Sequence, residues 1–170
     1  MSEIYIEEGF EGLFIDYIKD LGYEYVPQQE IVRDSMKSAL AVEILKDSLV
    51  RINPDLPSEV IEKAVYQVKH IDAGLLVIRN EAFFEYLQNG IEISHYTDGR
   101  QKTERVYLLD YENIYNNSFV ITNQLTIIGK DAKRPDIILY INGLPLVVIE
   151  LKSMTSEISD IGSAYRQIKN

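Results

Sequence analysis

The chain of 170 residues contains no cysteine, and this absence limits its chemistry. Without thiols it can form neither disulfide bonds nor thiolate nucleophiles and metal ligands. No apolar run is long enough to cross a bilayer, and no basic segment followed by an apolar stretch opens the chain, as a secretory leader requires. We therefore expect a cytoplasmic protein that makes no membrane contact.

A phosphate-binding loop and an excess of basic charge are also missing. No G-x-x-x-x-G-K-[ST] sequence occurs, so we do not expect this chain to bind ATP through such a loop. The net charge of −10 argues against a nonspecific binder of polyanions. Residues 1–32 hold eight acidic residues and one basic residue, Lys19, and thus carry most of this charge. The remainder can still present a local surface to phosphate, although we expect this chain alone to bind DNA weakly.

Length and apolar periodicity predict one domain over residues 1–170, with an α/β or α+β architecture. Helical spacing predicts helices at 10–21, 34–52, 58–68, 80–89 and 158–170, and alternation predicts strands at 91–97, 103–110, 119–128, 136–141 and 145–151. We expect Ser58 and Asn80 to cap their helices. This order is typical of a mixed β-sheet flanked by helices. The last helical pattern still runs at Asn170, which is typical of a domain excised from a longer chain.

The first predicted helix carries an apolar stripe with acidic residues beside it. The stripe consists of Phe10, Leu13, Phe14, Tyr17, Ile18 and Leu21, and Gly22 ends the helix. Glu7 and Glu11 share one flank with Phe14 and Ile18, because these residues are spaced three or four apart. We expect both carboxylates at the rim of the buried face, where they can reach inward.

The segment "RPDIILYINGLPLVVIELK" (134–152) combines two apolar strands with charged residues at one end. Glu150 and Lys152 are two residues apart, so they share one face of the second strand. That strand is apolar on both faces, which predicts a central strand covered on both sides. A carboxylate and an ammonium at its end would be partly desolvated and would need partners.

Whether Asp136 joins this pair depends on the turn at Asn142-Gly143. A two-residue loop places Asp136 opposite Ile149, facing away from Glu150. A three-residue loop with a bulged Gly143 places it opposite Val148, on the same face as Glu150. The shared site therefore requires an odd loop or a bulge, although Asn-Gly is the strongest signal for a two-residue turn.

Two carboxylates brought together in this way would favour a divalent cation. Oxygen ligands suit Mg²⁺, which is bound by few carboxylates and keeps several waters. A bound metal activates water, and a neighbouring lysine can orient that water or offset charge on the attacked phosphate. Asp136, Glu150 and Lys152 with Mg²⁺ would be sufficient to hydrolyse a phosphodiester.

The same segment closely resembles the PD-(D/E)xK nuclease signature of the restriction, or motor, subunit of type I restriction-modification enzymes. The resemblance extends over nearly the whole chain through "FEGLFIDYIKDLGYEYV", "INPDLP", "GIEI", "NNSFVITNQLTI" and "AYRQI", in the expected order. It implies a restriction-endonuclease-like core and a Mg²⁺-dependent endonuclease domain, with Mn²⁺ as an alternative ion. It also implies duplex DNA as substrate, methyltransferase and specificity subunits as partners, and ATP use only through motor domains absent from this sequence.

The resemblance assigns roles to individual positions. Asp136, Glu150 and the backbone carbonyl of Leu151 would bind the metal, Lys152 would be the catalytic lysine, and Glu11 would complete the site from the first helix. Glu7 is the fallback for Glu11. The family's last motif, Gln-x-x-x-Tyr, is matched by Gln167, but its tyrosine would fall at position 171, one residue beyond this sequence.

Two other functions remain open at this point. The domain could be a non-catalytic docking module of the restriction complex, or a PD-(D/E)xK nuclease of the repair or resolvase type. An intact set of Asp136, Glu150 and Lys152 disfavours a docking module, since assembly alone does not require buried charges there. Activity of the isolated domain would favour a resolvase or repair enzyme, because those enzymes act without a translocase.

Overall fold

The computed structural model describes residues 3–71 and 74–151, with side chains from Gly9 onward. Its helices and strands follow in the order α1 (Glu3–Asp20), β1 (Glu24–Tyr25), α2 (Val42–Ile52), α3 (Ser58–Lys69), α4 (Leu76–Asn89), β2 (Ile91–Thr97), β3 (Arg100–Val106), the short 3₁₀ helix η1 (Ile114–Asn116), β4 (Phe119–Asn123), β5 (Ile127–Ile128), β6 (Ala132–Lys133), β7 (Ile137–Ile141) and β8 (Leu144–Ile149). In this part of the chain, no helix is long and apolar enough to span a membrane.

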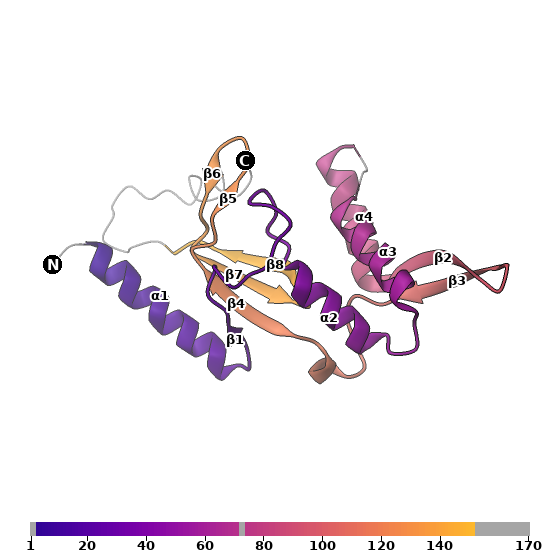
Figure 1. Cartoon of the computed structure of the whole chain (residues 1–170). Helices are drawn as coiled ribbons and strands as arrows, with labels where there is room; N and C mark the ends of the chain where they lie inside the picture. Colours follow the sequence, from indigo (N-terminus) through magenta and orange to yellow (C-terminus); the bar gives the residue numbers. More distant parts are fainter. Residues whose placement is uncertain (1–2, 72–73, 152–170) are drawn as a thin grey trace.

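The main sheet has the strand order β1-β4-β7-β8 and is mixed, as the sequence predicts. β1 runs parallel to β4, whereas β4, β7 and β8 are antiparallel neighbours. α1 lies along one side of this sheet and α2 along the other (Figure 1). The predicted α/β class with helices flanking a mixed sheet is thus confirmed.

Alternation along the strands of the sheet assigns side chains to two separate apolar layers. Ile121, Ile137 and Leu139 pack with Ile18 of α1 on one face. On the other face, the segment that precedes α2 and α2 itself pack on the sheet and form an apolar cluster with it. Its buried members are Ile31, Ala41, Val120, Leu125, Ile138 and Tyr140. β4 and β7, the two inner strands of the sheet, both contribute to the two layers.

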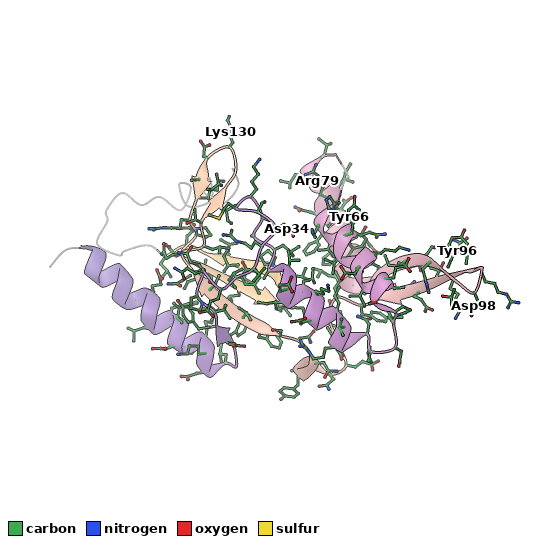
Figure 2. The ribbon with its side chains drawn as sticks, in the orientation of Figure 1. Asp34, Tyr66, Arg79, Tyr96, Asp98 and Lys130 are labelled. Carbon is green, nitrogen blue, oxygen red and sulfur yellow. The ribbon has the colours of Figure 1, made fainter. Side chains whose placement is uncertain are left out.

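A second lobe packs against the opposite side of α2. Leu45 and Leu49 of α2 join apolar residues of α3, β2 and β3, together with Leu144 from the start of β8. The β2–β3 hairpin extends away from this lobe, and Figure 2 shows Tyr96 and Asp98 at its far end. Its turn is the two-residue Asp98-Gly99, and the second strand, predicted at 103–110, runs instead from Arg100 to Val106.

Three predicted helix starts and both predicted caps are wrong. α1 begins at Glu3 instead of residue 10. α2 begins at Val42 instead of residue 34, because Ser35 and Ser38 accept hydrogen bonds from nearby backbone N–H groups and stabilise turns there. Ser58 is the first helical residue of α3 rather than its cap. Asn80 lies inside α4, which begins four residues earlier, since asparagine is tolerated inside helices at modest cost.

The first helix buries a narrower face than its apolar stripe predicts. Ile18 is only 7% exposed and Phe14 packs beside it, whereas Leu13 and Tyr17 are 70% and 60% exposed. The face that contacts the sheet is therefore the flank containing Glu11, Phe14 and Ile18. Glu11 is at the sheet-facing side of α1, half-buried.

The position predicted for the second strand of the β7–β8 hairpin is also wrong. Among the described residues, β8 is the edge of the four-stranded sheet, and Val147 and Val148 are 45% and 40% exposed. Apolar residues on both faces of a strand indicate burial, but they do not specify which strand has two neighbours. The predicted strand over 119–128 is likewise interrupted, because Gln124 adopts a left-handed backbone conformation with φ of 53°.

The turn between β7 and β8 is buried and tightly fitted. Asn142 and Gly143 have φ angles of 52° and 78°, as a two-residue turn with both central residues left-handed requires. A Cβ atom on Gly143 would overlap the carbonyl oxygen of Ala41 and the nitrogen of Leu45. The carbonyl oxygen of Gly143 accepts a hydrogen bond from the Ala41 N–H at 3.0 Å. Only glycine satisfies both the conformation and the space.

Replacing Gly143 by alanine should therefore destabilise the protein by about 3 kcal/mol or more, from backbone strain together with overpacking against α2. Gly99→Ala is the matched control, since Gly99 has φ of 72° but no atoms near its Cβ position. It should cost only the strain, about 1 kcal/mol. Urea unfolding measures both values, and equal losses would contradict the steric account.

Candidate functional site

The register of β7 and β8 places Asp136 and Glu150 on the same side of the hairpin. Close to the turn, Ile141 pairs with Leu144 and Tyr140 with Pro145. The register then shifts by one, so that Leu139 pairs with Val147 and Ile137 with Ile149. One residue further, this register puts Asp136 opposite Glu150, and opposed residues point to the same face.

The shift arises from a bulge at Leu146, which has no partner in β7. The loop itself keeps two residues, so the three-residue loop with a bulged Gly143 does not form. The structural condition stated from the sequence, an odd loop or a bulge, is met by a bulge elsewhere in the strand. A bulge also increases local twist and redirects the side chains beyond it.

Asp136 accepts two hydrogen bonds through different carboxylate oxygens. Its Oδ2 accepts from the backbone N–H of Leu151 at 2.7 Å, and its Oδ1 accepts from Nε2 of Gln124 at 3.2 Å. The Leu151 bond ties Asp136 to the end of β8, where Glu150 and the Leu151 carbonyl are found. Asp136, Glu150 and Leu151 are all half-buried, so this end of the sheet is partly desolvated.

Glu11 reaches the same place from α1. Its Oε2 accepts from Nε2 of Gln124 at 2.8 Å, and its Oε1 accepts from Nδ2 of Asn123 at 2.5 Å. The hydroxyl of Tyr25 in turn donates to Oδ1 of Asn123 at 2.8 Å, which orients that amide. The Gln124 amide is thus shared by the two acids, and the predicted helix-borne carboxylate lies at the predicted end of the sheet.

From the sequence, Asn123 and Gln124 are residues beside the hairpin that either line the pocket or make structural hydrogen bonds, and the structure shows that both form hydrogen bonds to the acids. The available signal was a pair of amides that directly follows the apolar run of β4, at the end of the strand that neighbours β7. Polar side chains at the end of a buried strand need hydrogen-bond partners. Two consecutive amides there therefore indicate that other polar groups lie beside them.

Other predicted residues are not placed by the structure. Lys152 and Gln167 lie outside the described residues, as does the predicted helix at 158–170, and the side chain of Glu7 is not described either. Within the described residues, no three acidic, histidine or cysteine side chains cluster as a preformed metal cage. The described part of the site consists of Glu11 and Asp136, which are linked by the Gln124 amide, the Asn123 amide beside them, and Glu150 opposite Asp136 in the hairpin.

The hydrogen bond from Leu151 to Asp136 can be tested directly. Asp136→Ala should accelerate hydrogen exchange of the Leu151 amide about tenfold, because a hydrogen bond to a charged acceptor is lost. The backbone N–H of Gln124 donates to the Asp136 carbonyl at 2.9 Å and serves as an internal control, since alanine retains that carbonyl. NMR-detected exchange measures both, and equal changes at the two amides would indicate general loosening instead.

Comparison with known proteins gives a consistent result. The family model described as "Type I restriction enzyme R protein N terminus" matches residues 3–170. The chain is 37% identical over 172 residues to the type I restriction enzyme HindI endonuclease subunit of Haemophilus influenzae, a match that covers 96% of this chain and 16% of that protein.

Further relatives carry similar names. A putative type I restriction enzyme endonuclease subunit of Methanocaldococcus jannaschii, MjaIXP, is 32% identical over 86% of this chain and 15% of its own length. The EcoprrI endonuclease subunit of Escherichia coli is 30% identical over 99% of this chain and 50% of its own length. The chain thus spans about a sixth of the HindI and MjaIXP relatives, and the predicted resemblance to the N-terminal part of a type I restriction subunit is confirmed.

Proposed function

Since the chain belongs to the family of type I restriction enzyme R protein N termini, we propose that it is the Mg²⁺-dependent endonuclease domain of such a subunit. It would hydrolyse phosphodiester bonds of unmodified duplex DNA, far from the recognition site. Motor domains of the same polypeptide would use ATP, and methyltransferase and specificity subunits would complete the enzyme. The observation that carries this proposal is the convergence of Glu11 and Asp136 on one amide beside the end of β8.

The residues present fit a magnesium ion. Mg²⁺ is commonly held by one or two carboxylates and retains several waters, so a complete protein cage is not required. Asp136 and Glu150 would be the ligands, with Glu11 and the Leu151 carbonyl completing the set. Leu151 lies two residues beyond the end of β8, and the hydrogen bond from its N–H to Asp136 keeps this residue beside the proposed site.

The chemistry divides between the ion and the side chains. A bound Mg²⁺ supplies Lewis-acid stabilisation of the negative charge that develops on the attacked phosphate. Lys152 would orient the attacking water and offset that charge. A bond forms between the water oxygen and phosphorus as one backbone P–O bond breaks, and the departing oxygen takes up a proton. Gln167 would contribute from the following segment, as the family motif implies.

Metal binding by the chain tests the ligand set. Asp136→Ala and Glu150→Ala should each weaken Mn²⁺ binding by at least about tenfold, because each removes a charged ligand. Glu11→Ala should weaken it as well, whereas Glu7→Ala, one helical turn away, should not. Isothermal titration calorimetry gives the dissociation constants. Identical values for all four variants and the wild-type chain would contradict this ligand set.

Lys152 separates a nuclease from a docking module of the same fold. In the assembled restriction enzyme, Lys152→Ala should leave Mn²⁺ binding and assembly intact but reduce DNA cleavage by at least about a hundredfold, as expected for a residue that acts on the reacting groups. Gel analysis of plasmid cleavage under ATP measures the rate. Full cleavage by this variant would refute the proposed role of Lys152, and full cleavage by Asp136→Ala would locate the nuclease elsewhere.

A further inference from the structure

The amide of Gln124 stands between two carboxylates that come from distant parts of the chain. Its Nε2 lies 2.8 Å from Oε2 of Glu11 and 3.2 Å from Oδ1 of Asp136. An amide NH₂ group carries two hydrogens, so it can donate one to each acid at the same time. One side chain therefore determines where both carboxylates lie relative to each other.

The backbone at Gln124 is adapted to this task. Its φ of 53° is a left-handed conformation that glycine or asparagine would adopt at lower cost. Its N–H donates to the carbonyl oxygen of Asp136 at 2.9 Å, which fixes this turn against the start of β7. Glycine has no side chain and asparagine is one methylene shorter than glutamine. The strained conformation at a residue with a long amide indicates that the amide is needed there.

The side-chain and backbone donors that the structure shows bonded to the two acids are neutral groups. Besides the shared Gln124 amide, Glu11 accepts from Asn123 and Asp136 accepts from the Leu151 backbone. A cationic side chain in this place would neutralise the pair and compete with a metal ion. Neutral donors fix the carboxylates in position and leave their charge available.

We infer that Gln124 is a positioning residue for the divalent cation, which holds Glu11 and Asp136 ready before the ion arrives. This inference rests on the proposed function. Each carboxylate oxygen has two lone pairs, so it can accept from the amide and also face a cation. Gln124 then acts as outer-shell support, a class of contact whose loss typically costs 10–100-fold in metal affinity.

The test compares two substitutions at Gln124 by calorimetry with Mn²⁺ and by thermal unfolding of the metal-free chain. Gln124→Met keeps an unbranched side chain of similar length but has no donor, so Mn²⁺ binding should weaken by about 10–100-fold. Gln124→Lys places an ammonium between the same acids. It should raise the unfolding midpoint of the metal-free chain above that of wild type and also weaken Mn²⁺ binding by competition.

Gln101→Met on β3 is the matched control, since Gln101 is exposed and lies on the distant β2–β3 hairpin. It should bind Mn²⁺ as the wild-type chain does. Wild-type affinity in Gln124→Met and Gln124→Lys would overturn the positioning role while the proposed ligands remain. If Gln124→Met does not fold, Gln124→Lys decides alone. If the wild-type chain binds no more Mn²⁺ than Asp136→Ala, the proposed metal site and this inference both fail.

Discussion

The buried turn at Asn142-Gly143 is the constraint from which the rest of the sheet takes its register. The side chain of Asn142 accepts from the Ser118 N–H and donates to the Leu108 carbonyl, so both of its polar atoms are committed. Gly143 closes against the start of α2 without room for a Cβ atom. This turn fixes how β7 and β8 begin to pair, and the bulge at Leu146 then adjusts the pairing by one residue. The opposition of Asp136 and Glu150 follows from these two main-chain features, both of them remote from the acids.

The sequence predicted the hairpin and its acidic end, and it placed Glu7 and Glu11 at the rim of the first helix, because each of these depends on local spacing. The choice of Glu11 over Glu7 came from the resemblance to the restriction subunit. It also stated that Asp136 and Glu150 share a face only with a bulge or an odd loop. The position of the bulge could not be predicted, because Leu146 is apolar like the residues around it and packing determines where a bulge forms. The prediction that β8 is a central strand failed for a similar reason. The residues of a strand indicate how deeply it is buried, whereas its number of neighbouring strands depends on the whole sheet.

α1 shows how tertiary packing chooses between two acceptable patterns. Phe10, Leu13 and Tyr17 form as good an apolar stripe as Phe14 and Ile18, yet the sheet covers the second. Glu11 belongs to the covered flank, and its hydrogen bonds to Asn123 and Gln124 stabilise that orientation of the helix. The polar contacts thus help to specify which face of the helix meets the sheet. Hydrophobic periodicity alone contains no information of this kind.

The bonds that Glu11 makes have a consequence for the order in which the chain folds. They join residues 112 and 113 positions apart, whereas the bond from Leu151 to Asp136 spans 15. By the logarithmic dependence of loop-closure entropy, the longer connections cost about 2 kcal/mol more to close. Contacts of such separation tend to form late, after the local hairpin. Glu11 and Asp136 can share the Gln124 amide only when α1 has docked, so a nascent or partly unfolded chain keeps these two negative charges apart.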